Sequence, residues 1–179
     1  TLGTFLLWFG WFGFNGFSQL AMGTFDDVNA ISKIAVNTHL AGAAGTVAAA
    51  VVTRLLGGKT DIVMMLNGAL AGLVAITAEP LTPSPVLAIV IGAIGSLIMY
   101  FGTKFLESKK IDDVVGAIPV HMFAGIFGTL VVPISNPDTN FGTQLTGVIA
   151  VCLFSFILSY ITFRVLKQTI GLRISAQAE

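Results

Sequence analysis

The amino-acid sequence predicts an all-α integral membrane protein with six transmembrane helices. Of its 179 residues, 55% are hydrophobic and only 10% are charged, whereas a soluble domain carries about 25% charged residues. The charges also fall in clusters that separate apolar stretches of about 20 residues, the length that spans a bilayer. A water-soluble globule is therefore excluded as the leading interpretation.

Six apolar stretches are candidates for spanning helices, and the third is short. They are Leu2–Met22, Ile31–Leu56, Ile62–Ala78, Pro85–Leu106, Val114–Ile134 and Leu145–Leu166. Loop signals separate them: Thr24, Asp26, Asp27 and Asn29, then Gly57–Asp61, Glu79–Pro83, Glu107–Asp113 and Ser135–Gly142. Six crossings would place both ends of the chain on the same side of the membrane.

The distribution of cations tests this count, because short cytoplasmic loops are enriched in Lys and Arg. Of nine Lys and Arg residues, only Lys33 falls on one face of the predicted bundle. The others fall on the opposite face: Arg54, Lys59, Lys104, Lys109, Lys110, Arg164, Lys167 and Arg173. The sequence therefore predicts a multi-pass protein of the cell (inner) membrane with a cytoplasmic C-terminus.

Several function classes lack support in the sequence. The formal net charge is zero, so the chain has no basic footprint for nucleic acid. It contains no Walker motif, dinucleotide fingerprint, zinc-ligand spacing or nucleophile elbow. The cluster Asp26–Asp27 offers too few ligands for a hard cation. We therefore expect neither an enzyme nor a cofactor nor a metal site.

Small residues recur inside the predicted spans, as at Gly42–Gly45, at Gly68 and Gly72, and at Gly92 and Ser96. In lipid, small residues allow helices to approach closely. We expect most of these glycines to serve the packing of a tight bundle.

The first span contains an aromatic stripe. Trp11, Phe14 and Ser18 lie at i, i+3 and i+7, on one face of a helix. Such a face can hold a small cation through the ring quadrupoles, with the Ser18 hydroxyl as an acceptor. Alternatively, aromatic residues at the end of a span form an interfacial belt. The residues alone favour the belt.

Two histidines lie within predicted spans. His121 follows Pro119, with Ala117 and Gly125 four residues to either side, so its imidazole would face a narrow space lined by small residues. It could relay a proton or a small polar molecule, or bond to a neighbouring helix, and the residues leave both readings open. For His39 we expect a structural role, because Asn37 and Thr38 beside it offer interhelical hydrogen bonds. Asp112 and Asp113 are expected to cap the fifth span.

Four strings resemble the ammonium transporter (Amt/Rh/Mep) family, in the order of that family: Leu2–Ser18, Leu66–Thr77, Asp112–Thr129 and Ile170–Arg173. The resemblance implies the sixth to eleventh spans of an eleven-helix fold built as an inverted repeat. It implies that residues 1–179 form one ammonium transporter-like domain, the C-terminal half of a longer chain. It also implies that ammonium or ammonia crosses the membrane through a homotrimer with one pore per subunit, in contact with membrane lipid.

The resemblance assigns roles to individual residues. Trp11 matches a tryptophan of the sixth span, Phe14 a gate phenylalanine, and Ser18 the hydroxyl of an outer recruitment site. Thr77 matches a pore-side threonine, His121 the second of two pore histidines, and Asp113 the acidic residue that opens the tenth span. It implies a PII-type regulator as a partner. A membrane ammonium sensor with a fused cytoplasmic output domain is the alternative, because Met122, Phe17 and the tail ISAQAE depart from the family pattern.

Overall fold

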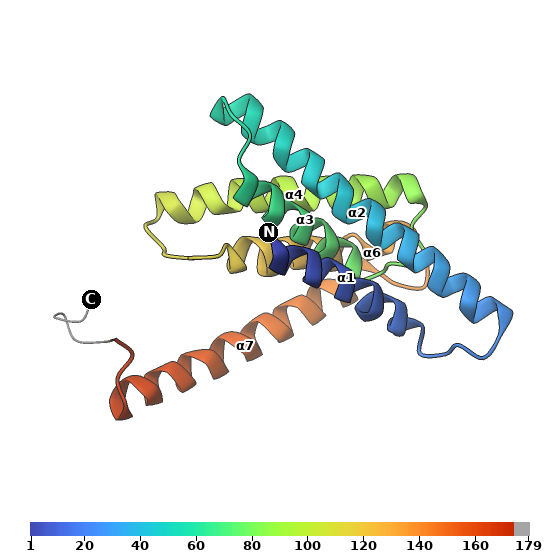
Figure 1. Ribbon diagram of the computed structural model, residues 1–179. Coiled ribbons are helices and arrows are strands. Elements are labelled where there is room, and N and C mark those ends of the chain that lie inside the picture. Colours follow the sequence, from blue (N-terminus) through green and yellow to red (C-terminus); the bar gives the residue numbers. More distant parts are fainter. Residues whose placement is uncertain (174–179) are drawn as a thin grey trace. The chain divides into compact units, whose positions relative to one another are not determined.

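The computed structural model describes residues 1–173, and every element of regular secondary structure in that range is helical (Figure 1). The elements are α1 (Leu2–Gly16), the 3-10 turn η1 (Phe17–Gln19), α2 (Phe25–Gly57), α3 (Ile62–Thr77), α4 (Pro85–Ser108), the π-helical turn η2 (Ile118–Phe123), α5 (Ala124–Leu130), α6 (Val132–Ser135) and α7 (Phe141–Thr169). The all-α prediction is confirmed. The tail ISAQAE, on which the sensor alternative draws, lies outside the described residues.

The chain divides into two compact units, Thr1–Phe141 and a second that begins at Gly142. Four helical stretches within residues 1–173 are long and apolar enough to cross a membrane: Phe25–Gly57, Pro85–Ser108, Ile118–Ser135 and Phe141–Thr169. Helix α3 is apolar but has only 16 residues. The prediction of several apolar helices is therefore confirmed, while the count of six crossings stays a prediction.

Helix α2 begins earlier than the sequence predicted. Thr24 is its N-cap, and the Thr24 side chain accepts from the backbone N–H of Asp27 at 3.1 Å while the Asp27 carboxylate accepts from the backbone N–H of Thr24 at 3.0 Å. This reciprocal capping box satisfies N–H groups that the first turn leaves free. Asp26, Asp27 and Asn29 therefore belong to the helix, and reading them as loop residues was wrong.

Helices α2, α3 and α4 pack against one another in the first unit (Figure 1). A Cβ atom added at Gly45 of α2 would collide with the carbonyl oxygen of Gly68 on α3. The Ser96 hydroxyl on α4 donates to the Gly45 carbonyl at 2.7 Å. The prediction that these small residues serve close packing is confirmed.

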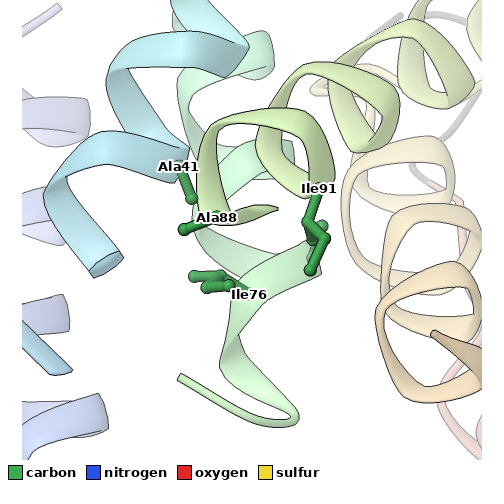
Figure 2. Close-up of a cluster of buried hydrophobic side chains, with 5 residues drawn as sticks. Ala41, Ile76, Ala88 and Ile91 are labelled. Carbon is green, nitrogen blue, oxygen red and sulfur yellow. The ribbon is translucent and has the colours of Figure 1, made fainter. Parts of the chain in front are cut away.

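A cluster of buried apolar side chains joins the same three helices. It comprises Ala41, Ala75, Ile76, Ala88 and Ile91, drawn in Figure 2. Alanines from each helix let the backbones approach, while the two isoleucines fill the remaining volume. The cluster holds α2, α3 and α4 together at this level of the first unit.

Two predicted spans differ from the observed helices. The first, predicted as Leu2–Met22, ends as an α-helix at Gly16, passes through η1 and reverses at Leu20, whose φ is 59°. Leu20 in the left-handed region cannot continue a right-handed helix.

The fifth, predicted as Val114–Ile134, begins as a helix only at Ile118. The reason is Gly116, whose φ of +73° is not helical, so residues 114–116 cannot form the first turn of the helix.

Candidate functional site

Trp11 and Thr77 are 66 residues apart in the sequence and in direct contact in the structure. The indole Nε1 of Trp11 donates to the Thr77 hydroxyl at 2.7 Å, and that hydroxyl donates to the backbone carbonyl of Leu73 at 2.7 Å. The indole is thereby held in one orientation by α3. Both residues are half-buried.

Phe14, in the last turn of α1, and Ser18, in η1, lie next to this pair. The ring of Phe14 lies 6.0 Å from that of Trp11, measured between centroids, with an angle of 53° between the planes. The Ser18 hydroxyl, in η1, donates to the Phe14 carbonyl at 3.3 Å. Phe14 is 66% exposed. The structure therefore brings Trp11, Phe14, Ser18 and Thr77 together, with an exposed ring and an exposed hydroxyl at the surface.

A buried hydrogen bond between Asn15 and Thr38 lies next to Phe14 in the sequence. Asn15 is fully buried, and its side-chain amide donates to the Thr38 hydroxyl on α2 at 2.9 Å. This bond ties the end of α1, at the residue that follows Phe14, to α2. Sequence reasoning did not assign a role to Asn15, although an amide inside an apolar span is itself a signal of an interhelical bond.

His121 is exposed, although it lies in the stretch Ile118–Ser135 that is long and apolar enough to span a membrane. The opposite side of η2 is buried: Pro119 and Val120 face the core, where Val120 packs with Met99 and Ala124. His121 lies in the π-helical turn η2, and the alignment of Ala117 and Gly125 with it on one face stays a prediction.

Asp113 holds the backbone that leads into η2. One carboxylate oxygen accepts from the N–H of Ala117 at 2.9 Å and the other from the N–H of Ile118 at 2.8 Å. This geometry confirms the capping prediction for Asp113. Asp112 is exposed and the structure shows no such bond for it among residues 1–173.

His39 packs against aromatic rings of α1. Its ring centroid lies 5.5 Å from that of Trp8 and 6.2 Å from that of Phe12. Its neighbours Asn37 and Thr38 make the hydrogen bonds: the Asn37 amide donates to the carbonyls of Pro80 and Pro83 at 3.0 and 2.9 Å. Within residues 1–173 no hydrogen bond or ring contact joins Trp11, Phe14, Ser18 or Thr77 to His121, and no group of three His, Cys, Asp or Glu side chains could hold a metal ion.

Comparison with known proteins gives a consistent family. The sequence model of the Ammonium Transporter Family, a family of transport proteins, matches residues 1–179. The chain is 40% identical over 198 residues to ammonium transporter Amt2 of Archaeoglobus fulgidus, covering 99% of this chain and 42% of that protein. It is 35% identical to ammonium transporter Amt1 of Haloferax mediterranei, covering 99% of this chain and 37% of that protein.

Solved structures agree. A structure of a sensor Amt protein superposes with a TM-score of 0.89 at 37% identity, covering 98% of this chain and 45% of that one. Candida albicans Mep2 superposes with a TM-score of 0.87 at 26% identity, covering 98% of this chain and 42% of that one. The chain thus spans less than half the length of the relatives and structures it matches.

Proposed function

We propose, because this chain belongs to the Ammonium Transporter Family, that it forms the second half of an ammonium transporter subunit. In this proposal residues 1–179 are one domain containing the sixth to eleventh spans of an eleven-helix inverted repeat. The match of the family model from the first residue to the last, together with a coverage of only 42% of Amt2, supports this placement.

The exposure of His121 carries the proposal. An ionisable side chain at membrane depth is costly when it faces lipid, so such groups face the interior of a bundle or a water-filled path. His121 is exposed within unit 1. A first half of the transporter packed over this face would enclose the imidazole and place it in a conducting path.

Trp11, Phe14, Ser18 and Thr77 form the outer site in this proposal. An ammonium ion is attracted by the rings of Trp11 and Phe14 and donates to the Ser18 hydroxyl. Thr77 holds the indole in place. The ion gives up a proton before or within the apolar path, since a neutral ammonia molecule crosses at far less cost than an ion. Potassium cannot lose a proton, which gives selectivity.

The proposed assembly is the one that the resemblance to the family implies. We propose a homotrimer with one pore per subunit in the cell (inner) membrane, with a cytoplasmic C-terminus and a PII-type regulator. The cation distribution supports the orientation.

Uptake of labelled methylammonium into proteoliposomes tests the proposal, using the full-length transporter that carries this segment. We expect His121→Ala to abolish most uptake and Ser18→Ala to raise the half-saturating concentration about 3-fold or more. Thr46→Val is the matched control, because within residues 1–173 the Thr46 hydroxyl bonds to the Gly42 carbonyl of its own helix and to no other residue. Uptake by His121→Ala at the rate of Thr46→Val would contradict the proposed path.

A membrane ammonium sensor is the second candidate, favoured by the similarity to a sensor Amt protein. In that case the same site couples to a fused cytoplasmic output domain. Ammonium binding without methylammonium flux in the same proteoliposomes would select this alternative. Substrate-dependent flux would exclude a pure sensor.

A further inference from the structure

Asn67 of α3 contacts the backbone turn from which the His121 helix begins. Its side-chain Nδ2 donates to the carbonyl of Val115 at 3.1 Å, across 48 residues of sequence. Asn67 is half-buried and lies in the second turn of α3, a helix whose buried residues include Gly68, Ala69 and Ala71. The amide is therefore anchored on a well-packed element.

Gly116, the next residue after Val115, makes this contact close. Its φ is +73°, a conformation that side chains with a Cβ rarely adopt. A Cβ atom at Gly116 would lie 2.7 Å from Asn67 Nδ2. The Asn67 amide thus packs against the Cα atom of Gly116. The hydrogen bond holds the turn against α3, and the lack of a Cβ atom at Gly116 makes this close approach possible.

Backbone hydrogen bonds connect this turn to η2. The N–H of Gly116 donates to the Asp113 carbonyl at 3.1 Å, and the N–H of Val120 donates to the Gly116 carbonyl at 3.1 Å. Asp113 caps Ala117 and Ile118. From Asp113 to Val120 the backbone therefore has little freedom once Val115 and Gly116 are fixed.

The far side of η2 is fitted to α4. A Cβ atom at Gly102 would lie 2.9 Å from Cε2 of Phe123 and 3.2 Å from Cβ of Pro119. This packing leaves His121 on the exposed side. The direction of the imidazole is therefore set by the rotation of η2, which α4 fixes on one side and the Asn67 turn fixes at the start.

We propose that Asn67 is a positioning residue for His121, acting through the Val115 carbonyl and the Gly116 turn. The inference rests on the proposed role of His121 in the conducting path. Asn67 sets the place of the imidazole without touching the substrate. Its loss should therefore reduce the maximal rate of transport and leave recruitment at Ser18 and Phe14 unchanged, since displacements of about 1 Å at a reacting group lower rates by large factors.

The test uses the full-length transporter in proteoliposomes, with rates normalised to folded protein measured by gel filtration. Asn67→Leu keeps the size of the side chain and removes the donor, and Asn67→Ser keeps a donor in a smaller side chain. We expect Asn67→Leu to lower the maximal methylammonium uptake rate about 10-fold with the half-saturating concentration within about twofold of wild type. Asn67→Ser should lie between Asn67→Leu and wild type.

Two controls separate the outcomes. Thr46→Val reports the effect of losing a hydrogen bond elsewhere in the bundle, and His121→Ala reports the role of the histidine. An Asn67→Leu maximal rate equal to that of Thr46→Val, or a change in half-saturation alone, would overturn the positioning role while leaving the His121 path intact. Unchanged uptake by His121→Ala would instead refute the proposed function. In a His121 variant with residual uptake, Asn67→Leu should have no further effect, whereas additive losses would count against a role exerted through His121.

Discussion

The Trp11 indole and the Thr77 hydroxyl form a hydrogen bond of 2.7 Å that joins α1 to α3. The same hydroxyl donates its proton to the Leu73 carbonyl. The oxygen lone pairs of Thr77 can therefore accept the hydrogen bond from the Trp11 N–H. The indole therefore meets an acceptor that is already oriented. Because Trp11 also lies 6.0 Å from Phe14, this one bond fixes the aromatic side of the candidate outer site.

Thr77→Val should lower the free energy of unfolding by about 1 kcal/mol, because the Trp11 N–H loses its acceptor. A double-mutant cycle with Trp11→Phe, followed by thermal unfolding in detergent, measures the coupling directly. We expect the effect of Thr77→Val to shrink when Trp11 is already replaced. Fully additive effects would mean that the bond contributes nothing to stability.

Gly45→Ala should lower the free energy of unfolding by about 2 kcal/mol, since the added methyl collides with the Gly68 carbonyl oxygen and α2 must move away from α3. Gly57→Ala is the matched control, because a Cβ at Gly57 meets nothing within 4 Å. Thermal unfolding of both variants checks the difference. Equal melting temperatures would refute the close approach of α2 and α3.

Asp113→Ala should expose the start of η2, because the N–H groups of Ala117 and Ile118 lose their acceptors. We expect faster hydrogen exchange at these two amides and a lower methylammonium uptake rate. Asp112→Ala removes the neighbouring carboxylate, which is exposed, and should change neither measurement. Protection at Ala117 and Ile118 that survives Asp113→Ala would contradict the capping role.

Thr38→Val should lower the free energy of unfolding by about 1 kcal/mol, because the fully buried Asn15 amide loses its acceptor. Thr46→Val, which breaks a bond within α2 only, should have a smaller effect. Replacing Asn15 by Leu in the Thr38→Val background should recover part of the loss. A further loss of the same size would show that the pair is not coupled.

The helices were predictable because their signals are local. The approximate positions of α2, α3 and α4 follow from runs of apolar residues bounded by charges and prolines. The caps follow from the chemistry of single residues, as Asp113 shows. The start of α2 was missed because Asp26 and Asp27 are typical both of loops and of first helical turns, and only the capping box with Thr24 decides between them.

The π-helical turn at His121 could not be predicted from the sequence. Pro119 and Gly116 were visible, but the register of η2 depends on Gly102 of α4 and Asn67 of α3, which are distant in the chain. The same holds for Trp11 and Thr77. The resemblance to a family named both as site residues, yet no property of either residue alone indicates that they touch. Long-range pairs of this kind require the packed bundle.

Helix α3 is shorter than the hydrocarbon core of a bilayer. With 16 residues, α3 rises about 24 Å, against about 30 Å for the hydrocarbon core of a bilayer. Its ends carry carboxylates, the N-cap Asp61 and, just beyond Thr77, Glu79, which bonds to the Asn136 amide at 2.8 Å. In the proposed membrane-spanning arrangement α3 is shorter than the hydrocarbon core, so the carboxylates at its two ends come closer together than the two surfaces of that core.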